Sequence, residues 1–223
     1  LIGDMIMNIP FLRNIRSNCP NAKVTMVCMP WAEAVLGDQG LIDNFVVFDG
    51  KNKLSGPSQI LKNWREIVST IKFLNKKEYQ IGFEPKGDLR HILFLHYVKC
   101  ARTITYNYTG GDFLVTDSKT PLPDTKHLID EKLDLLRLSG FAVDENAVVP
   151  ILGLTDKWKC KANEFKKAYF NSDKLIVGVH PGASNVNKQY QFYPEVVALL
   201  VAEYGERIQF CIFEGSGEQD AVT

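Results

Sequence analysis

Residues 176–188 (IVGVHPGASNVNK) join an apolar run to a glycine turn, a hydroxyl and a lysine. The β-branched run at the start is typical of a buried strand in a parallel sheet. In the turn that follows, the backbone N–H groups of Gly182 and Ala183, the Ser184 hydroxyl and the Lys188 ammonium could together hold a phosphate. Short glycine motifs are weak signals, so an ordinary loop between a strand and a helix is the alternative.

Two other places carry groups that could do chemistry. Asp4 follows Gly3 and precedes a helical pattern, so its carboxylate could take a proton from a substrate hydroxyl or could simply cap the helix. Lys86, Asp88 and Arg90 form a charged group after an apolar run. Arg90 could bind a carboxylate or phosphate through two parallel hydrogen bonds, and the alternative is a charged surface beside a helix start.

Other chemistries lack their sequence signatures. Glu214 and Glu218 flank a Gly-Ser-Gly turn, where they could accept hydrogen bonds from a hydroxyl-rich ligand or be merely solvated. His91 and His96 are five residues apart, which is not the spacing of a helical zinc site. The chain has no Ser-His-Asp order, no Walker lysine motif and no GxGxxG fingerprint. We therefore expect neither a metal nor a cofactor.

The composition is that of an ordinary globular protein. Of the 223 residues, 45% are hydrophobic and 23% are charged, and the formal net charge is zero. A neutral chain has no basic field that would attract nucleic acid, so we expect no nucleic-acid partner, and local groups must hold any anionic ligand. The five cysteines are scattered and lack CxxC spacing, which favours free thiols.

The elements that must position these residues alternate between strand and helix. After a helix that ends before Pro20, strands are expected at 23–29, 44–48, 79–83, 103–106, 175–179 and 207–213. Helices are expected at 31–36, 58–74, 89–97, 127–138, 158–170 and 194–204, and residues 107–126 are expected to form a long loop. Ser139-Gly140 is expected to end the helix at 127–138. In the helix at 58–74, Ser58 is the expected cap and Trp64 belongs to the inward-facing stripe.

This alternation predicts an α/β fold with two Rossmann-like, doubly wound domains, residues 1–150 and residues 151–223. Residues 1–4 are interpreted as the tail of a strand, so the first domain is expected to lack its first strand. The second domain is expected to be incomplete, because the chain stops soon after the turn at Glu218. Ligands of such folds bind beyond the carboxyl ends of the strands, where the groups named above lie.

Taken in order, these stretches resemble the glycosyltransferase family of ADP-heptose:lipopolysaccharide heptosyltransferases (glycosyltransferase family 9), which has the two-domain GT-B fold. The segment that opens with Gly3-Asp4 and reaches Pro10 is similar to the family's "GD…P" segment, and Pro20-Asn21-Ala22-Lys23-Val24 resembles its "PxAxI" entry to the second strand. Gly87-Asp88-Leu89-Arg90 falls at its "G-x-x-R" acceptor loop. His180-Pro181-Gly182-Ala183-Ser184 with Lys188 resembles its "HPGAS…K-W-P" signature.

The resemblance implies an inverting, metal-independent transfer of heptose or a related sugar from a nucleotide-diphosphate sugar to an anionic lipopolysaccharide core acceptor. ADP-heptose is the donor that it favours. It implies that Asp4 is the general base and that Gly182, Ala183, Ser184 and Lys188 hold the donor diphosphate. Glu218 would lie near the donor's sugar or nucleoside, and Arg90 with Lys86 would face the acceptor glycolipid. It also implies a cytoplasmic protein and leaves open a peripheral contact with the inner membrane.

The sequence departs from the family's pattern in two places. The family's tryptophan after the lysine is replaced by Gln189-Tyr190-Gln191-Phe192-Tyr193, with the proline shifted to Pro194. The family's downstream "DTG…H" segment does not occur in the 223 residues, so we expect this stretch alone to be inactive. Two alternatives stay open: a non-catalytic nucleotide-sugar-binding module of the same fold, and another GT-B enzyme such as a nucleotide-sugar epimerase.

Overall fold

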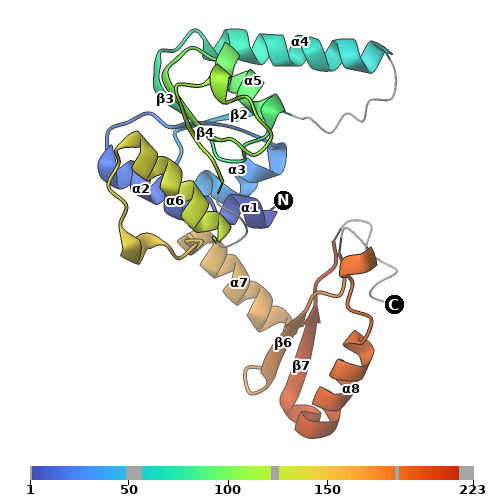
Figure 1. Cartoon of the computed structure of the whole chain (residues 1–223). Coiled ribbons are helices and arrows are strands. Elements are labelled where there is room, and N and C mark those ends of the chain that lie inside the picture. The colour runs from blue at the N-terminus through green and yellow to red at the C-terminus, as the bar shows by residue number, and fades with distance from the viewer. Residues whose placement is uncertain (1, 49–56, 122–125, 184–185, 216–223) are drawn as a thin grey trace. The chain divides into compact units, whose positions relative to one another are not determined.

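The structure is a computed structural model that describes residues 2–48, 57–121, 126–183 and 186–215 (Figure 1). The chain divides into two compact units, Leu1–Gly153 and Leu154–Thr223. The division lies a few residues after position 150, where the sequence places the domain boundary. Each unit is considered by itself below.

The first unit contains six α-helices and five strands among its described residues. The helices are α1 (Ile2–Ile6), α2 (Ile9–Asn18), α3 (Pro30–Leu36), α4 (Pro57–Leu74), α5 (Leu89–Tyr97) and α6 (Leu128–Ser139). The strands are β1 (Thr25–Cys28), β2 (Asn44–Val47), β3 (Tyr79–Glu84), β4 (Cys100–Tyr106) and β5 (Asp117–Lys119). Short 3₁₀ turns η1 (Gly37–Gln39), η2 (Asp112–Leu114) and η3 (Glu145–Ala147) lie between them.

The strands pair in parallel, as the alternating pattern predicts. β1 pairs with β2, and β4 lies between β3 and β5 in a three-stranded sheet. Glu84 of β3 aligns with Thr105 of β4, and Tyr106 of β4 aligns with Lys119 of β5. This register brings the carboxyl ends of all three strands to one edge.

The core of the first unit forms where α2 and α6 pack together and against β4 (Figure 1). Ile9 of α2, Leu133 and Leu136 of α6 and Ile104 of β4 are fully buried. Burying an aliphatic side chain of this size contributes about 1.5–3 kcal/mol, so this contact holds α6 firmly on the sheet. α6 ends at Gly140, whose φ of 89° lies in the left-handed region that favours glycine, as the sequence predicts.

Three local expectations are wrong. Residues 2–6 form helix α1 instead of a strand tail, and Asp4 lies inside that helix, while Asn8 stands at the N-cap of α2. Residues 107–126 are not one loop, because β5 at Asp117–Lys119 extends the sheet. Trp64 does not face inward, since it is 62% exposed. Short polar strands such as β5 carry too little apolar pattern to be recognised from sequence.

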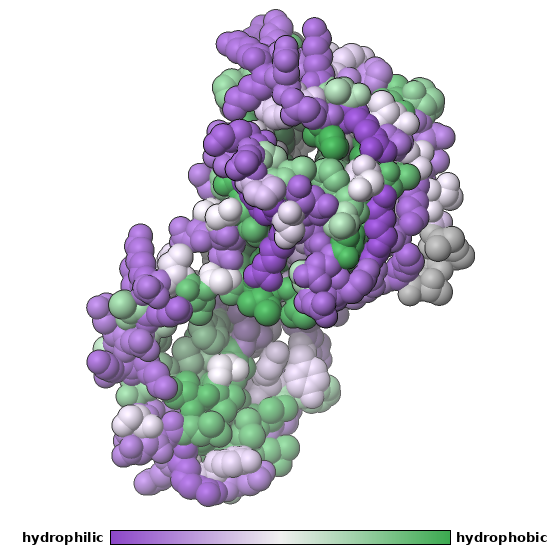
Figure 2. Space-filling view, turned by 90° about the vertical axis from the view of Figure 1, so that its left-hand side faces the viewer, coloured by the Kyte–Doolittle hydropathy of each residue, from purple (hydrophilic) through white to green (hydrophobic). Residues whose placement is uncertain are grey.

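The second unit contains α7 (Asp156–Tyr169), β6 (Leu175–Val179), the 3₁₀ turn η4 (Val186–Lys188), α8 (Tyr193–Tyr204), η5 (Gly205–Arg207) and β7 (Ile208–Ile212). β6 and β7 pair in parallel with Leu175 opposite Ile208. Figure 2 shows hydrophobic residues gathered on the surface of this unit. Leu199 of α8 is 70% exposed. A two-stranded parallel sheet with one crossover helix cannot bury both of its faces by itself.

Two further observations concern the whole described chain. All five cysteines are free, as expected, and burial together with the charge of Glu33 raises the pKa of the Cys28 thiol to about 11. Among the helices that the structure describes, none has the length and apolar character needed to cross a membrane.

The contact between α5 and β3 yields a stability prediction. A Cβ added at Gly82 of β3 would lie 2.6 Å from Leu95 Cδ1 and 2.8 Å from Cys100 Sγ. We expect Gly82→Ala to lower the free energy of unfolding by about 1–3 kcal/mol, because the neighbouring side chains must shift. Thermal denaturation followed by circular dichroism measures the change.

Gly37→Ala is the matched control for this variant. A Cβ at Gly37 would have Glu33 Cγ as its nearest neighbour, 3.9 Å away, and Gly37 has a helical φ of −58°. The control should therefore melt at or slightly above the wild-type temperature. Equal melting temperatures for Gly82→Ala and wild type would contradict the close packing of α5 on β3.

Candidate functional site

The last residues of the three paired strands in the first unit are chemically distinct. β3 ends at Glu84, β4 at Tyr106 and β5 at Lys119. In parallel α/β folds the ligand lies in the crevice beyond the carboxyl ends of the strands. This edge, with the loops that leave it, is therefore the candidate site of the first unit.

Glu84 is a buried carboxylate that organises the loop after β3. It is 6% exposed, and its Oε2 accepts hydrogen bonds from the Gly87 N–H at 2.5 Å and from the Thr105 hydroxyl at 3.0 Å. Its Oε1 accepts a hydrogen bond from the Lys86 N–H at 3.2 Å and lies 3.3 Å from Nδ1 of His91. These bonds satisfy a carboxylate that would otherwise be costly to bury, and they fix the turn that leads to α5.

Gly87 is a position at which only glycine fits. Its φ is 67°, and an added Cβ would lie 2.6 Å from Tyr108 Cδ2 and 2.9 Å from the Tyr106 carbonyl oxygen. The Thr109 hydroxyl donates to the Gly87 carbonyl at 2.9 Å and accepts from the Leu89 N–H at 2.8 Å. The loop after β4 thereby supports the loop after β3 through hydrogen bonds of Thr109.

Arg90, the predicted acceptor-binding residue, is held in place by Asp88. Its Nε and Nη2 donate to the two Asp88 carboxylate oxygens at 3.0 and 2.6 Å, and Asp88 also caps α5 through the Arg90 N–H. These hydrogen bonds hold the pKa of Asp88 well below its usual range. The Arg90 side chain is still 82% exposed, so the pair presents an oriented guanidinium to solvent. Lys86 is exposed beside it.

Asp134 of α6 is a buried carboxylate surrounded by cations. Its Oδ2 lies 2.8 Å from Lys119 Nζ and 2.6 Å from Lys126 Nζ, and its Oδ1 lies 2.8 Å from Arg137 Nη1. Burial by itself raises the pKa of Asp134, but the hydrogen bonds from these cations and the charge of Lys119 outweigh it and lower the pKa to about 2. The cluster ties β5 and the segment before α6 to the helix.

Asp4, the predicted base, lies in α1 of the first unit, and its backbone carbonyl oxygen contacts the side chains of Asn8 and Lys132. The Asn8 side-chain amide donates to the Asp4 carbonyl oxygen at 2.9 Å, and Lys132 Nζ of α6 lies 3.5 Å from the same oxygen. Lys132 is only 7% exposed. Asn8 Oδ1 is buried and has no hydrogen-bond partner within the part of the chain that the structure describes.

In the second unit, the turn after β6 contains the described part of the predicted phosphate cradle. Gly182 and Ala183 follow β6, and the Gly182 carbonyl oxygen lies 3.1 Å from Nδ1 of His180. Lys188 ends η4 and is exposed. Ser184 and Glu218 lie outside the described residues.

Shortly after Lys188 in the sequence, three aromatic residues form a cluster. The Tyr190 ring packs edge-on against the rings of Phe192 and Tyr193, with centroids 5.6 and 5.3 Å apart. Tyr190 and Phe192 are more than half exposed.

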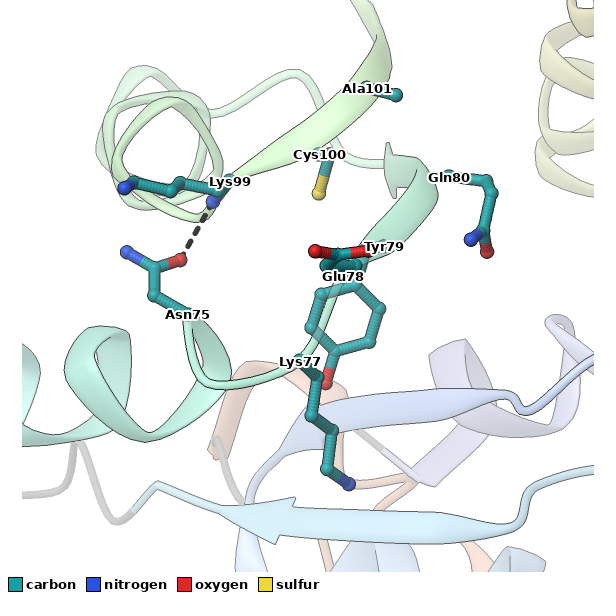
Figure 3. Close-up of a pocket in the computed structure, with 8 residues that line it drawn as sticks. All are labelled: Asn75, Lys77, Glu78, Tyr79, Gln80, Lys99, Cys100 and Ala101. Atoms are coloured by element: carbon teal, nitrogen blue, oxygen red, sulfur yellow. Dashed lines mark hydrogen bonds between the residues drawn. The ribbon is translucent and has the colours of Figure 1, made fainter.

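A pocket of about 540 Å³ lies elsewhere in the first unit (Figure 3). Residues at the amino ends of β3 and β4 line it, and there the Lys99 N–H donates to Asn75 Oδ1 at 2.7 Å. This is the opposite edge of the sheet from Glu84 and Tyr106, and no residue predicted from sequence lines it. We do not assign the candidate site to this pocket, because the charged, oriented groups lie at the carboxyl edge.

Several residues of this edge are not marked as functional by the sequence. Glu84 follows the strand expected at 79–83, Tyr106 ends the strand expected at 103–106, and Lys119 lies in the loop expected at 107–126. Lys132 and Asp134 lie in a helix with a regular apolar stripe, where a charged residue is usually solvated. Both residues lie next to leucines that are buried. This is the one signal that could have marked them as buried charges, because a helix face in contact with a core rarely carries charge.

Comparisons with known proteins identify the fold. No protein-family model matches the sequence, and no curated protein sequence matches it significantly. Among solved structures, the glycosyl transferase family 9 protein from Veillonella parvula matches with a TM-score of 0.76 and 18% identity, over 100% of this chain and 62% of that chain. The ADP-heptose lipopolysaccharide heptosyltransferase II of E. coli matches with a TM-score of 0.75 and 15% identity, over 99% of this chain and 63% of that chain.

The E. coli heptosyltransferase WaaC with ADP-2-deoxy-2-fluoro heptose matches with a TM-score of 0.69 and 12% identity, over 99% of this chain and 69% of that chain. At these identities the likeness establishes the fold, which is that of the GT-B heptosyltransferases, as the resemblance predicts. The chain spans about 62–63% of the length of the first two of these proteins.

The Asp134 cluster yields a pH-dependent stability prediction. A carboxylate with a pKa of about 2 in the folded chain stabilises the fold above its unfolded pKa, and this stabilisation is lost as the pH falls from about 4 to about 2. Asp134→Asn should therefore lower the free energy of unfolding by about 2 kcal/mol at pH 7. Thermal denaturation between pH 7 and pH 2 should show the variant and wild type converging at the acid end.

Asp130→Asn, an exposed carboxylate one turn earlier in α6, is the control and should change the melting temperature little at any pH. A destabilisation by Asp134→Asn that is constant down to pH 2 would argue against the ion cluster.

Proposed function

We propose that this chain is the acceptor-binding unit and part of the donor-binding unit of an inverting glycosyltransferase. The enzyme moves heptose or a related sugar from a nucleotide-diphosphate sugar to an anionic lipopolysaccharide core acceptor. ADP-heptose is the leading candidate for the donor. The observation that carries the proposal is the whole-chain likeness to the structures of a glycosyl transferase family 9 protein and of a heptosyltransferase. The oriented charged groups at the carboxyl edge of β3–β4–β5 support it independently.

The proposed reaction is a direct displacement at the anomeric carbon. The Asp4 carboxylate takes the proton of the acceptor hydroxyl, whose oxygen forms a bond to the sugar as the bond to the diphosphate breaks. The nucleoside diphosphate leaves with the electron pair. The configuration at the anomeric carbon is inverted, because the attack comes from the side opposite the leaving group.

Charge that builds on the leaving diphosphate needs fixed donors. The N–H groups of Gly182 and Ala183, the Ser184 hydroxyl and the Lys188 ammonium are the proposed donors, and no metal is required where they neutralise the charge. Glu218 is the proposed contact to the donor's sugar or nucleoside. The exposure of Lys188 is consistent with a group that binds an incoming ligand.

Arg90 is the proposed acceptor contact, and Lys86 is the second. The bidentate pair with Asp88 fixes the Arg90 guanidinium while leaving it 82% exposed, which suits recognition of a carboxylate or phosphate on an anionic glycolipid. An acceptor of this kind is anchored in a membrane. The proposal therefore places the protein in the cytoplasm with a peripheral contact at the inner membrane.

A non-catalytic nucleotide-sugar-binding module is the second candidate. The exposed aromatic cluster Tyr190–Phe192–Tyr193, at the position of the family's tryptophan, is the observation that favours it. A transfer assay with radiolabelled ADP-heptose and lipid-linked core acceptor, on the full-length protein, separates the two. Label in the glycolipid supports the enzyme, and donor binding without transfer supports the module.

The role of Asp4 is tested by Asp4→Asn in the full-length protein. The amide cannot accept the hydroxyl proton, so we expect kcat to fall by about 10²- to 10⁴-fold while the donor Kd stays within about twofold of wild type. Isothermal titration calorimetry gives the Kd, and Asp38→Asn serves as the control for a lost surface charge. Transfer at a near wild-type rate would exclude Asp4 as the base.

The role of Lys188 is tested by Lys188→Ala with Lys167→Ala, an exposed lysine of α7, as the control. Loss of one fixed positive charge at the leaving group should lower kcat/KM for the donor by about 100-fold, whereas the control should leave it unchanged. If Lys188→Ala and Lys167→Ala changed kcat/KM by the same factor, a specific role of Lys188 would be contradicted.

A further inference from the structure

Lys132 is a buried charge for which the proposed reaction has no role so far. Among the residues that the structure describes, three charged side chains are buried: Glu84, Lys132 and Asp134. Glu84 and Asp134 are each surrounded by several hydrogen-bond donors. Lys132, 7% exposed, instead directs its Nζ to α1, where it lies 3.5 Å from the Asp4 carbonyl oxygen.

An ammonium in such a place needs negative charge close by. Removing it from water costs several kcal/mol unless a carboxylate or a set of carbonyl groups compensates it. Burial lowers the pKa of Lys132, and the negative charges of Asp4 and Glu131 act against that effect. Glu131 accepts a hydrogen bond from the Tyr108 hydroxyl, which holds this carboxylate toward the loop after β4. Asp4 is the carboxylate that another element brings to Lys132.

Other charged groups on the elements around α1 and α6 are engaged elsewhere. α3, which packs against α1, carries one charged residue, Glu33, and its charge acts on Cys28. The remaining cations on elements that contact α6 bind other partners: Arg13 binds the carbonyls of Val149 and Ile151, Arg16 binds Asp43, Arg102 binds Asp117, and Lys119 binds Asp134. Lys132 is a cation that α6 directs to the Asp4 carbonyl oxygen.

We propose that Lys132 is a positioning residue for the general base, and that its buried ammonium, held by α6 against the Asp4 carbonyl oxygen, fixes α1 and with it the place of Asp4. The inference rests on the proposed function, since it presumes that Asp4 is the base. The position of Lys132 is set by α6, because Leu133 and Leu136 of the same helix are fully buried against the sheet. The benefit to the reaction lies in the orientation of the base.

The first test measures the coupling between Lys132 and Asp4 without any assay of activity. Lysine labelled with ¹³C at Cε is titrated by NMR in the full-length protein, and the Lys132 resonance is assigned as the one lost in Lys132→Met. Because the Asp4 charge supports the protonated lysine, Asp4→Asn should lower the pKa of Lys132. The control Asp130→Asn should leave it unchanged. A Lys132 pKa that is the same in Asp4→Asn and wild type would overturn the inference.

The second test measures kcat of Lys132→Met. We expect kcat to fall by about 10- to 100-fold, because the base is no longer held in place, with an unchanged donor Kd. Lys126→Met, which removes a cation from Asp134 instead, should leave kcat near the wild-type value. Lys132→Arg, which keeps the charge and the hydrogen-bond donors, should restore kcat.

The outcomes separate the inference from the proposed function. If Asp4→Asn abolishes transfer while Lys132→Met keeps wild-type kcat, the inference fails and the function stands. If Asp4→Asn transfers sugar normally, the role of Asp4 fails, and the NMR titration still decides whether Lys132 is coupled to it. If Lys132→Met does not fold, Lys132→Arg and the titration of Asp4→Asn carry the test.

Discussion

The parallel pairing of β3, β4 and β5 is the constraint on which the rest of the first unit depends. Because all three strands run the same way, Glu84, Tyr106 and Lys119 reach one edge together. The oriented polar groups of the first unit are built on that edge: the turn at Gly87, the Asp88–Arg90 pair, and the cations around Asp134. α6 packs its leucines on the same sheet and carries Lys132 to α1.

The charged groups of this unit show how a chain with no net charge can present single, oriented charges. The Glu84 carboxylate is satisfied by backbone and hydroxyl donors, so it shapes a loop without adding charge at the surface. Asp88 orients Arg90 yet leaves it exposed. Local pairing of this kind gives single charges a fixed position and direction, which an overall basic field would not. The proposed recognition of an anionic acceptor depends on such fixed charges.

Much of the fold could be predicted from sequence, because apolar periodicity and turn residues determine it. The helix at 89–97 and the glycine end of α6 are found where the pattern predicts them. β5 was missed because Asp117–Lys119 has no apolar alternation, and its pairing depends on Arg102 and Thr103 of the neighbouring strand. Helix α1 was missed because five residues carry too little pattern.

The buried charges could not be selected from sequence, since burial of a charge depends on partners distant in the chain. The partners are Thr105 for Glu84, Asp4 for Lys132 and Lys119 for Asp134. Asp4, Arg90 and Lys188 were selected by their place at strand ends and by family resemblance, and their roles stay predictions.

The central claim is that one carboxylate of the first unit activates an acceptor for direct displacement at a nucleotide sugar. The most direct measurement is the anomeric configuration of the product formed by the full-length protein from ADP-heptose and a core acceptor, read from the one-bond C1–H1 coupling by NMR. Direct displacement predicts the configuration opposite to that of the donor, with one nucleoside diphosphate released for each sugar transferred. A product with the donor's configuration, or diphosphate released without any sugar transferred, would contradict the account.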